Sequence, residues 1–401
     1  MSRRTIFIII IILIVAAIIF GLYYFLGTPS ITPTPGSQNG GQTSGLPSLA
    51  PAQNSFKQIA QFTPSGATGT STAGVPLSDR FGVVSQAPAS SYFADPQDNV
   101  VIVQADGQIV QTHNGQATVL SSSLVRDLIS SSFSYDGKKV LIVSGDRIKP
   151  QLNVFDVAAR AWTTLSISIQ NPVWSPAGYA LAYLEKTTTG NDLRSLDLSA
   201  KTTPKPKTIA TFHLQDIDIQ WSAPQRIIIK ERSSAAVKSS VWAFDMKAST
   251  LTPLDQEVAG LESTWDASGS YGALFAAGPI ARGGTLRVVN AGHQLLAADF
   301  LTLPSKCVFI PAAGTSTQPA TLLCATPRNQ AAFTGATLPD AYNQKELYTD
   351  DRFILIDLAT QTNSVPFNDP DVYVDATDLT VVNSRAFFIN RYDNRVYGFL
   401  L

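Results

Sequence analysis

Few residue patterns in the sequence could support catalysis or bind a metal. It has three histidines, His113, His213 and His293, whose spacing is far wider than that of a local ligand set. No Gly-x-Ser-x-Gly elbow, phosphate-binding glycine loop or His-Glu-x-x-His motif occurs. We therefore expect no catalytic residues, no cofactor and no metal site. An enzyme assembled from scattered residues stays open, with no motif to favour it.

An acidic segment, residues 368–378, could supply oxygen ligands to calcium. A calcium loop of the EF-hand type needs glycine at its sixth position and glutamate at its twelfth. Counted from Asp369, these positions hold Val374 and Thr380. The segment is therefore predicted to be a solvent-exposed turn rather than a metal site.

The two cysteines, Cys307 and Cys324, fall on neighbouring predicted strands. Antiparallel neighbours can bring such side chains within bonding distance, and a location outside the cytoplasm would permit a disulfide. Two separate buried cysteines are the alternative. With only two cysteines in 401 residues, either arrangement is structural.

The composition favours a strand-rich protein. Charged residues make up 15% of the chain, and 26 glycines and 24 prolines supply many turns. The formal net charge is −1, so no basic face is expected and nucleic acid is an unfavourable partner.

Two sequence marks recur along the chain at a nearly constant period. The first is an aromatic residue just before a turn, at Phe133, Trp174, Trp221 and Trp265, with separations of 41, 47 and 44 residues. The second is an aliphatic strand that ends in aspartate, at Asp156, Asp197 and Asp245, with separations of 41 and 48 residues. Periods of this length with four short strands are typical of β-propeller blades.

The residue pattern of the repeat resembles that of TolB-like, WD-repeat-like β-propellers. The resemblance rests on residues 133–140 (Phe-Ser-Tyr-Asp-Gly-Lys-Lys-Val) and 173–178 (Val-Trp-Ser-Pro-Ala-Gly), and it extends over about residues 79–401. Residues 221–225 depart from this pattern because they lack the glycine. Residues 265–269 (Trp-Asp-Ala-Ser-Gly) keep the glycine but differ in the residues before it. The resemblance implies an all-β fold but is silent on activity, because propellers have many unrelated functions.

We predict about seven four-stranded blades. The first six span residues 90–120, 128–165, 171–212, 217–254, 262–303 and 306–367. The last stretch offers only three strands, at residues 379–382, 386–390 and 395–400. Residues 80–85 are predicted to supply its fourth strand, which would close the ring and remove an exposed edge.

The N-terminus predicts a membrane anchor. Residues 6–26 are uncharged and mostly aliphatic, long enough for a helix to cross a bilayer. Arg3 and Arg4 precede this run and the next charge is Lys57, which favours a cytoplasmic N-terminus and an extracytoplasmic remainder. A cleaved signal peptide is the alternative, but the apolar run is long and its end is a poor cleavage site.

We therefore divide the chain into three parts. Residues 1–27 form the cytoplasmic tip and anchor, residues 28–76 a flexible linker rich in Pro, Gly, Ser and Thr, and residues 77–401 the propeller.

One segment, residues 328–351, interrupts the sixth blade. Its Pro339 and Asp340 suggest a helix start, and insertions in repeat proteins often lie on the binding face. A structural cap is the alternative to partner binding. The apolar positions that could contact a partner are Leu338, Tyr342, Leu347 and Tyr348.

Together these features favour a single-pass membrane protein whose extracytoplasmic propeller binds or scaffolds another envelope protein. The alternative is an extracytoplasmic enzyme or carbohydrate-binding propeller that uses the central channel; a small-molecule ligand is left open. The innermost strands should discriminate between them. Small, apolar side chains there would exclude catalysis, whereas converging carboxylate, His or Arg side chains would favour it.

Overall fold

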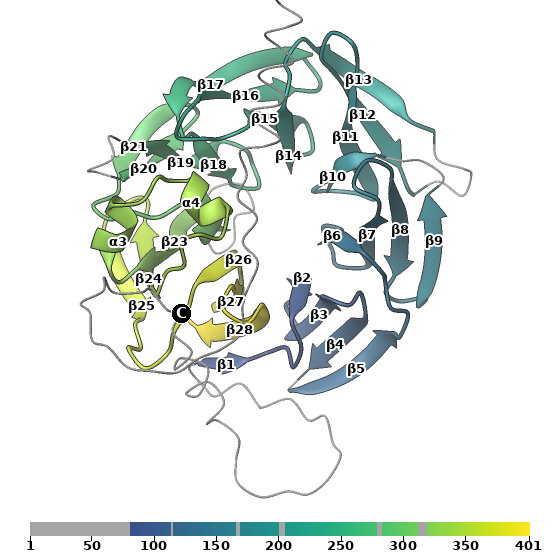
Figure 1. Cartoon of the computed structure of the whole chain (residues 1–401), viewed down its shortest axis with the longest axis horizontal. Coiled ribbons are helices and arrows are strands. Elements are labelled where there is room, and N and C mark those ends of the chain that lie inside the picture. Colours follow the sequence, from purple (N-terminus) through teal and green to yellow (C-terminus); the bar gives the residue numbers. More distant parts are fainter. Residues whose placement is uncertain (1–80, 114, 166–168, 200–204, 279–282, 312–318) are drawn as a thin grey trace, which may run out of the picture. The chain divides into compact units, whose positions relative to one another are not determined.

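A computed structural model describes residues 81–113, 115–165, 169–199, 205–278, 283–311 and 319–401. These residues form seven antiparallel sheets of four strands each, arranged as the blades of a ring (Figure 1). The prediction of an all-β, seven-bladed propeller is therefore confirmed. The predicted anchor and linker lie outside the described residues. Within those residues, no helix is long and apolar enough to cross a membrane.

The blades follow one another along the chain, and each begins with its innermost strand. Blade one contains β2 (Ala89–Ala94), β3 (Asn99–Gln104), β4 (Ile109–His113) and β5 (Gln116–Ser121). Blade two contains β6 (Leu128–Phe133), β7 (Lys139–Gly145), β8 (Pro150–Asp156) and β9 (Ala161–Leu165). Blade three contains β10 (Gln170–Trp174), β11 (Ala180–Lys186), β12 (Asn191–Asp197) and β13 (Lys207–Phe212). Blade four contains β14 (Ile217–Ala223), β15 (Arg226–Glu231), β16 (Lys238–Asp245) and β17 (Thr250–Ala259).

The helices of the described chain lie in blade six and just before it. Blade five contains β18 (Glu262–Trp265), β19 (Tyr271–Ala277), β20 (Gly284–Asn290) and β21 (His293–Ala297), and a 3-10 turn, η2 (Pro304–Lys306), follows it. Blade six contains β22 (Cys307–Pro311), β23 (Pro319–Pro327), β24 (Asp351–Asp357) and β25 (Asn363–Phe367). Between β23 and β24 lie α3 (Gln330–Thr334) and α4 (Asp340–Asn343). Blade seven contains β26 (Ala376–Val382), β27 (Arg385–Asn390), β28 (Arg395–Leu400) and β1 (Phe81–Val83).

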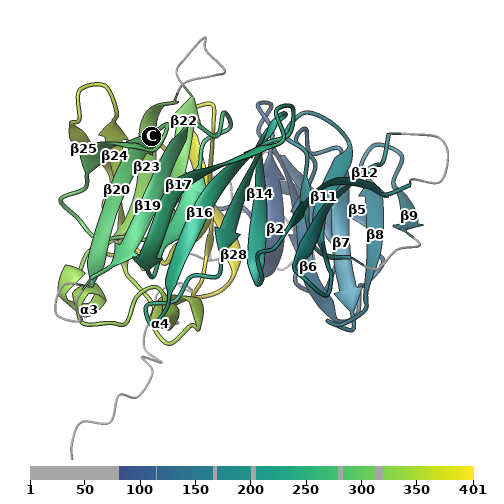
Figure 2. The same ribbon diagram turned by 90° about the horizontal axis from the view of Figure 1, so that it is seen from above.

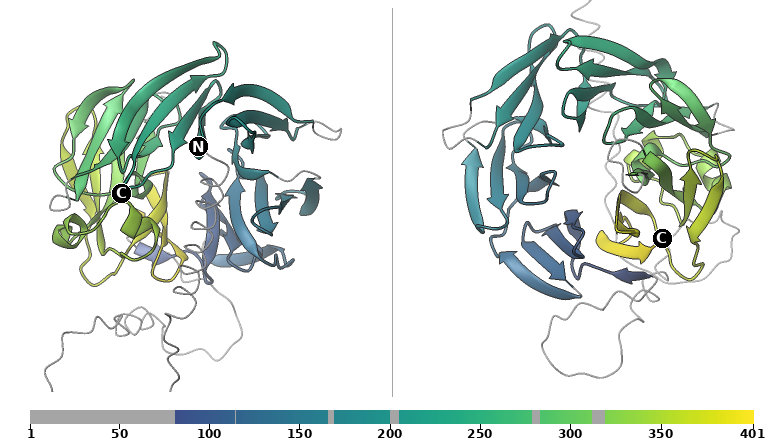
Figure 3. Two further views of the ribbon diagram at one scale, coloured as in Figure 1. Left: turned by 45° about the horizontal axis from the view of Figure 1, so that its top comes forward. Right: turned by 180° about the vertical axis from the view of Figure 1, so that it is seen from behind.

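The two ends of the described chain pair to complete the ring. β1 is the outer strand of blade seven and runs antiparallel to β28, with Phe81 opposite Phe399 and Val83 opposite Tyr397. Figure 3 shows the purple first strand beside the yellow last strands. The prediction that residues 80–85 complete the last blade is confirmed for the strand that the structure describes.

The recurring aromatic residue packs between blades. Trp174 is buried with Leu141 and Leu181, which lie on the second strands of blades two and three. The turn after Phe133 needs its glycine, because Gly137 has a φ of +70° and an added Cβ would come within 2.2 Å of the Phe93 ring.

The two departures from the repeat have local explanations. β14 and β15 are joined by a two-residue turn, Pro224-Gln225, which is shorter than the five-residue turns of blades two, three and five and needs no glycine. In blade five Asp266 organises the turn, because its carboxylate accepts hydrogen bonds from the amides of Ser270 and Tyr271.

Antiparallel order defines two faces of the ring. Turns between first and second strands and between third and fourth strands lie on one face, whereas second-to-third connections and links between blades lie on the other. We call the second face the insertion face because it carries α3 and α4, which extend beyond the strands in Figure 2. β1 begins at Phe81, beside the last residues of β28, and so starts on the opposite face.

An aromatic cluster holds the closing blade. Phe399 is almost fully buried, and its ring centroid lies 4.5 Å from that of Phe353 and 5.1 Å from that of Phe367. Phe81 on β1 stacks on Phe367 at 5.0 Å. Hydrophobic packing between blades six and seven thus adds to the strand pairing at the point of closure.

We expect Phe399→Ala to lower the free energy of unfolding by about 3–5 kcal/mol, the usual cost of emptying a buried Phe site. Leu400→Ala is the matched control, because Leu400 is the next residue and is 43% exposed. It should change stability by less than about 0.5 kcal/mol. Urea unfolding of the full-length protein in detergent, followed by tryptophan fluorescence, measures both. Equal effects would show that the cluster does not stabilise closure.

Candidate functional site

A polar pocket of about 1060 Å³ lies on the inner wall of the ring at the insertion face. We call it the wall pocket. The inner strands β14 and β18, the β15–β16 hairpin, η2 and α4 all contribute to it. Its lining residues are Gln215, Asp216, Asp218, Gln220, Lys230, Glu231, Arg232, Ser233, Ser234, Val237, Lys238, Leu261, Glu262, Ser263, Thr264, Pro304, Ser305, Asp340, Asn343 and Gln344.

Three charged side chains come from the strands of the wall pocket. Asp218 on β14 is directly opposite Lys230 on β15, so both side chains lie on the same face of blade four. Glu262 begins β18 of blade five. Burial lowers the pKa of the Lys230 ammonium, although Asp218 and Glu262 oppose the shift. Burial raises the pKa of the Glu262 carboxyl, which a hydrogen bond from Asn343 and the charge of Lys230 partly offset.

α4 forms one side of the wall pocket and is tied to both neighbouring blades. The Asp340 carboxylate accepts hydrogen bonds from the Ala235 amide at 2.8 Å and from the Ser234 hydroxyl at 3.2 Å. The Asn343 side chain donates to Glu262 Oε1 at 2.6 Å. The insertion therefore fixes the orientation of Glu262 while it borders the pocket.

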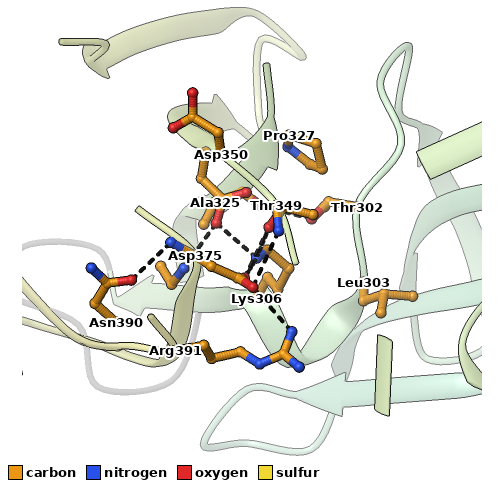
Figure 4. Close-up of polar contacts among 12 residues, drawn as sticks. Thr302, Leu303, Lys306, Ala325, Pro327, Thr349, Asp350, Asp375, Asn390 and Arg391 are labelled. Atoms are coloured by element: carbon orange, nitrogen blue, oxygen red, sulfur yellow. Dashed lines mark hydrogen bonds and ion pairs between the residues drawn. The ribbon is translucent and has the colours of Figure 1, made fainter. Parts of the chain in front are cut away.

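A buried ionic network anchors the insertion. Lys306 Nζ lies 2.7 Å from Asp351 Oδ2 and 2.6 Å from Asp375 Oδ1, and all three side chains are fully buried. Lys306 also donates to Tyr342 in α4 and to Thr349 at the end of the insertion. Figure 4 shows Lys306, Asp375 and Arg391 side by side.

The network is balanced in charge and joins three parts of the chain. Arg391 adds a second cation, which lies 3.1 Å from Asp375 Oδ2 and donates to the backbone carbonyl of Tyr342 at 3.0 Å. Burial alone would lower the pKa of Lys306, but the neighbouring Asp351, Tyr342 and Asp375 raise it. Blade six, blade seven and the insertion are thereby held around one ammonium group.

The apolar residues of the insertion lie mostly in a core that it shares with blade five, which contributes Phe275. Leu338 and Tyr342 are buried with Phe333 from α3, and Leu347 packs against the same cluster. Tyr348 is 43% exposed and stacks on Tyr392 at 5.7 Å. Of these four positions, Tyr348 offers the most surface to a partner. The sequence correctly placed a helix start at Asp340 and missed α3, which Asn329 caps.

The acidic segment is only partly the solvent-exposed turn that we predicted. Residues 368–371 are exposed, but Val374 and Asp375 are fully buried. The prediction was wrong for Asp375 because Lys306, 69 residues earlier in the chain, supplies a buried countercharge. A lone lysine directly before the apolar β22 was the sequence signal for this pair.

The remaining predicted residues lie away from the wall pocket. Cys307 and Cys324 are direct partners on β22 and β23 and form a disulfide. His113, His213 and His293 are exposed and lie on three different blades or their connections, none on an inner strand. Among the described residues, no group of three or more His, Cys, Asp or Glu side chains could hold a metal ion.

The inner strands do not match either sequence-based expectation fully. They carry many polar residues, including Ser91, Ser131, Asp218, Glu262 and Asp378, and are therefore not simply small and apolar. The described residues of the seven inner strands include no histidine and no arginine. The polar wall allows ligand binding and leaves catalysis open.

We expect Lys306→Met to lower the free energy of unfolding by about 3–5 kcal/mol, because it leaves buried carboxylates short of a cation. Lys138→Met is the control. Lys138 is 68% exposed beside Asp136, so its loss should cost at most about 1 kcal/mol. Urea unfolding measures both, and a cost near that of the control would contradict a structural role for the network.

We expect Glu262→Gln to stabilise the protein at neutral pH. Because folding raises the pKa of Glu262, the stability that this group contributes is complete below its unfolded pKa. It is lost as the pH rises towards the folded pKa. The variant should therefore gain on the order of 0.5 kcal/mol at about pH 7 and gain nothing at about pH 3.

Urea unfolding at the two pH values tests this expectation. The control is Glu346→Gln, an exposed position in the insertion outside the wall pocket, which should have no effect at either pH. A loss of stability in Glu262→Gln at neutral pH would show that the charged carboxylate is favourable there.

Comparison with known proteins supports the fold. No known protein family and no curated protein matches the chain. Among solved structures, an oligogalacturonate lyase in complex with manganese has a TM-score of 0.53 and 11% identity, with 80% of this chain and 93% of that chain covered. The oligogalacturonate lyase of Vibrio parahaemolyticus has a TM-score of 0.53 and 9% identity, with 79% and 92% covered.

TolB from Acinetobacter baumannii is also similar, with a TM-score of 0.41 and 15% identity over 73% of this chain. The chain spans 64% of the length of that protein, less than two thirds. At their identities, the similarities to the two oligogalacturonate lyases support the fold alone. The chain is therefore a seven-bladed β-propeller, and its function has to be argued from its own residues.

Proposed function

We propose that this protein is a single-pass membrane protein whose propeller, outside the cytoplasm, binds another protein of the cell envelope. The wall pocket is its binding site. The pocket carries the proposal because it is large and polar and is bordered by the insertion in blade six. Insertions on one face of a repeat protein commonly provide its binding surface.

The proposed location rests on the N-terminal sequence. Residues 6–26 are long and apolar enough to span a bilayer, and Arg3 and Arg4 favour a cytoplasmic N-terminus. The Cys307–Cys324 disulfide agrees with an oxidising compartment outside the cytoplasm.

The direction of the chain favours a partner that is not the membrane itself. β1 starts on the face opposite the insertion face, so the described chain begins on the side of the ring away from the wall pocket. A flexible linker raises the local concentration of the propeller near the membrane. The wall pocket thus lies on the face away from Phe81, where β1 begins.

A catalytic use of the same pocket is the second candidate. The pKa of Lys230 is lowered and that of Glu262 is raised, and such opposite shifts are found in acid–base pairs. Binding is preferred, because the described pocket lining contains no histidine, cysteine or triad arrangement that would activate a nucleophile.

Site-specific photo-crosslinking in intact membranes tests the proposal. A photoreactive residue in place of Gln344, in the pocket, should crosslink to a distinct envelope protein. The same residue in place of Ala248, an exposed turn position of blade four on the opposite face, should not. Crosslinks from both positions, or from neither, would contradict the wall pocket as the binding site.

The location is tested in the same cells by fractionation. The full-length chain should sediment with membranes, whereas a variant that lacks residues 1–27 should not. Membrane association that survives the deletion would contradict the anchor.

A further inference from the structure

The three charged side chains that the strands contribute to the wall pocket do not form ion pairs. Among the described residues, no ion pair within 4.0 Å involves Asp218, Lys230 or Glu262. Each carboxylate has a neutral amide donor instead. Asn171 donates to Asp218 at 3.3 Å, and Asn343 donates to Glu262 at 2.6 Å. Amide donors orient the carboxylates without neutralising them, so both charges remain available to a ligand.

Of the other acidic lining residues, Asp340 and Asp216 have partners, and Glu231 adds a further carboxylate. Asp340 accepts two hydrogen bonds from the β15–β16 hairpin, and Asp216 lies 3.6 Å from Lys186. Arg232 and Lys238 are exposed, as is Asp218, so solvent screens all three charges. The lining residues carry five carboxylates and three cations, a net charge of −2, so the wall favours a cation.

The uncharged lining fits a peptide better than a ring-shaped ligand. None of the described lining residues is aromatic, so the pocket offers no stacking surface for a sugar or a nucleobase. It does offer hydroxyl and amide side chains that match the donors and acceptors of a main chain. One of them, the Ser233 hydroxyl, is buried and has no hydrogen-bond partner in the structure. A hydroxyl that lines a pocket and has no protein partner is available to bond a polar group of a ligand.

We propose that the wall pocket recognises an extended protein segment that bears one lysine or arginine, with its cation between Asp218 and Glu262. This inference rests on the proposed function and names the chemistry of the partner. Lys230 donates to a backbone carbonyl of the segment, and Ser233 bonds to its main chain. Because Arg232 and Lys238 add positive charge at the rim, residues beside the bound lysine or arginine are neutral or acidic.

Three capped peptides test the proposal. They share a background of serine, glycine and asparagine and differ only at the central residue, which is lysine, norleucine or glutamate. Binding to the full-length protein in detergent is measured by fluorescence anisotropy. The lysine peptide should bind about tenfold more tightly than either of the others, the effect of one well-placed charge pair.

Variants of the protein locate the preference. Asp218→Asn and Glu262→Gln should each reduce the preference for lysine, and the double variant should remove it. Lys230→Gln keeps a donor and removes a positive charge, so the lysine peptide should bind at least as tightly as before. Glu346→Gln, on the same face but outside the pocket, should leave all affinities unchanged.

Two outcomes overturn the inference. One is equal binding of the three peptides, or of none; the other is a lysine preference that survives in the double variant. The proposed function is judged separately by the crosslinks from Gln344. If these form while the peptides show no charge preference, the protein binds a partner in the wall pocket but does not select a basic side chain.

Discussion

The pairing of β1 with β28 is the constraint on which the rest of the structure depends. Each blade packs one face of its sheet against the next blade, so a ring with an open last blade would expose both an edge and an apolar surface. Residues more than 300 positions apart meet at this closure, where Phe81 lies opposite Phe399. The aromatic cluster of Phe353, Phe367 and Phe399 reinforces it by burial. Closure fixes the angles between blades, and so positions the side chains that blades four and five contribute to the wall pocket.

The insertion in blade six shows how the same scaffold supports a site. Its anchoring depends on charges that would be costly if unpaired, because Lys306, Asp351 and Asp375 have no contact with water. Once they are paired, the network holds Tyr342 and hence α4, which borders the wall pocket and orients Glu262 through Asn343. The buried ion pairs stabilise the anchoring of α4, whereas the pocket keeps exposed and half-buried charges that do not form ion pairs with one another. Such a division is typical of binding sites, where groups that favour a ligand are unfavourable without it.

Much of the fold could be predicted from local patterns. Two sequence marks repeat with the blades: the aromatic residues at 133, 174, 221 and 265, and the aspartates that end strands. They repeat because every blade packs against its neighbours in the same way. Even the use of residues 80–85 as a closing strand followed from a count of strands, because a three-stranded blade would leave an edge. The site was harder to predict. Asp218, Lys230 and Glu262 belong to different strands and two blades, and nothing in their sequence spacing distinguishes them from other charges on a sheet.

The sequence by itself determined the repeat, the number of blades and the position of the insertion, because these depend on periodicity and turn chemistry along the chain. Only the tertiary structure decided which residues of the insertion are exposed. Leu338 and Tyr342 had the apolar spacing of a binding surface, but they pack against Phe333 from a helix that the sequence did not reveal. Likewise, Asp375 belongs to an acidic segment for which we predicted exposure to solvent, but it is buried in an ion pair with Lys306. Both outcomes depend on contacts between distant segments, whose burial and charge compensation arise only when the ring has closed.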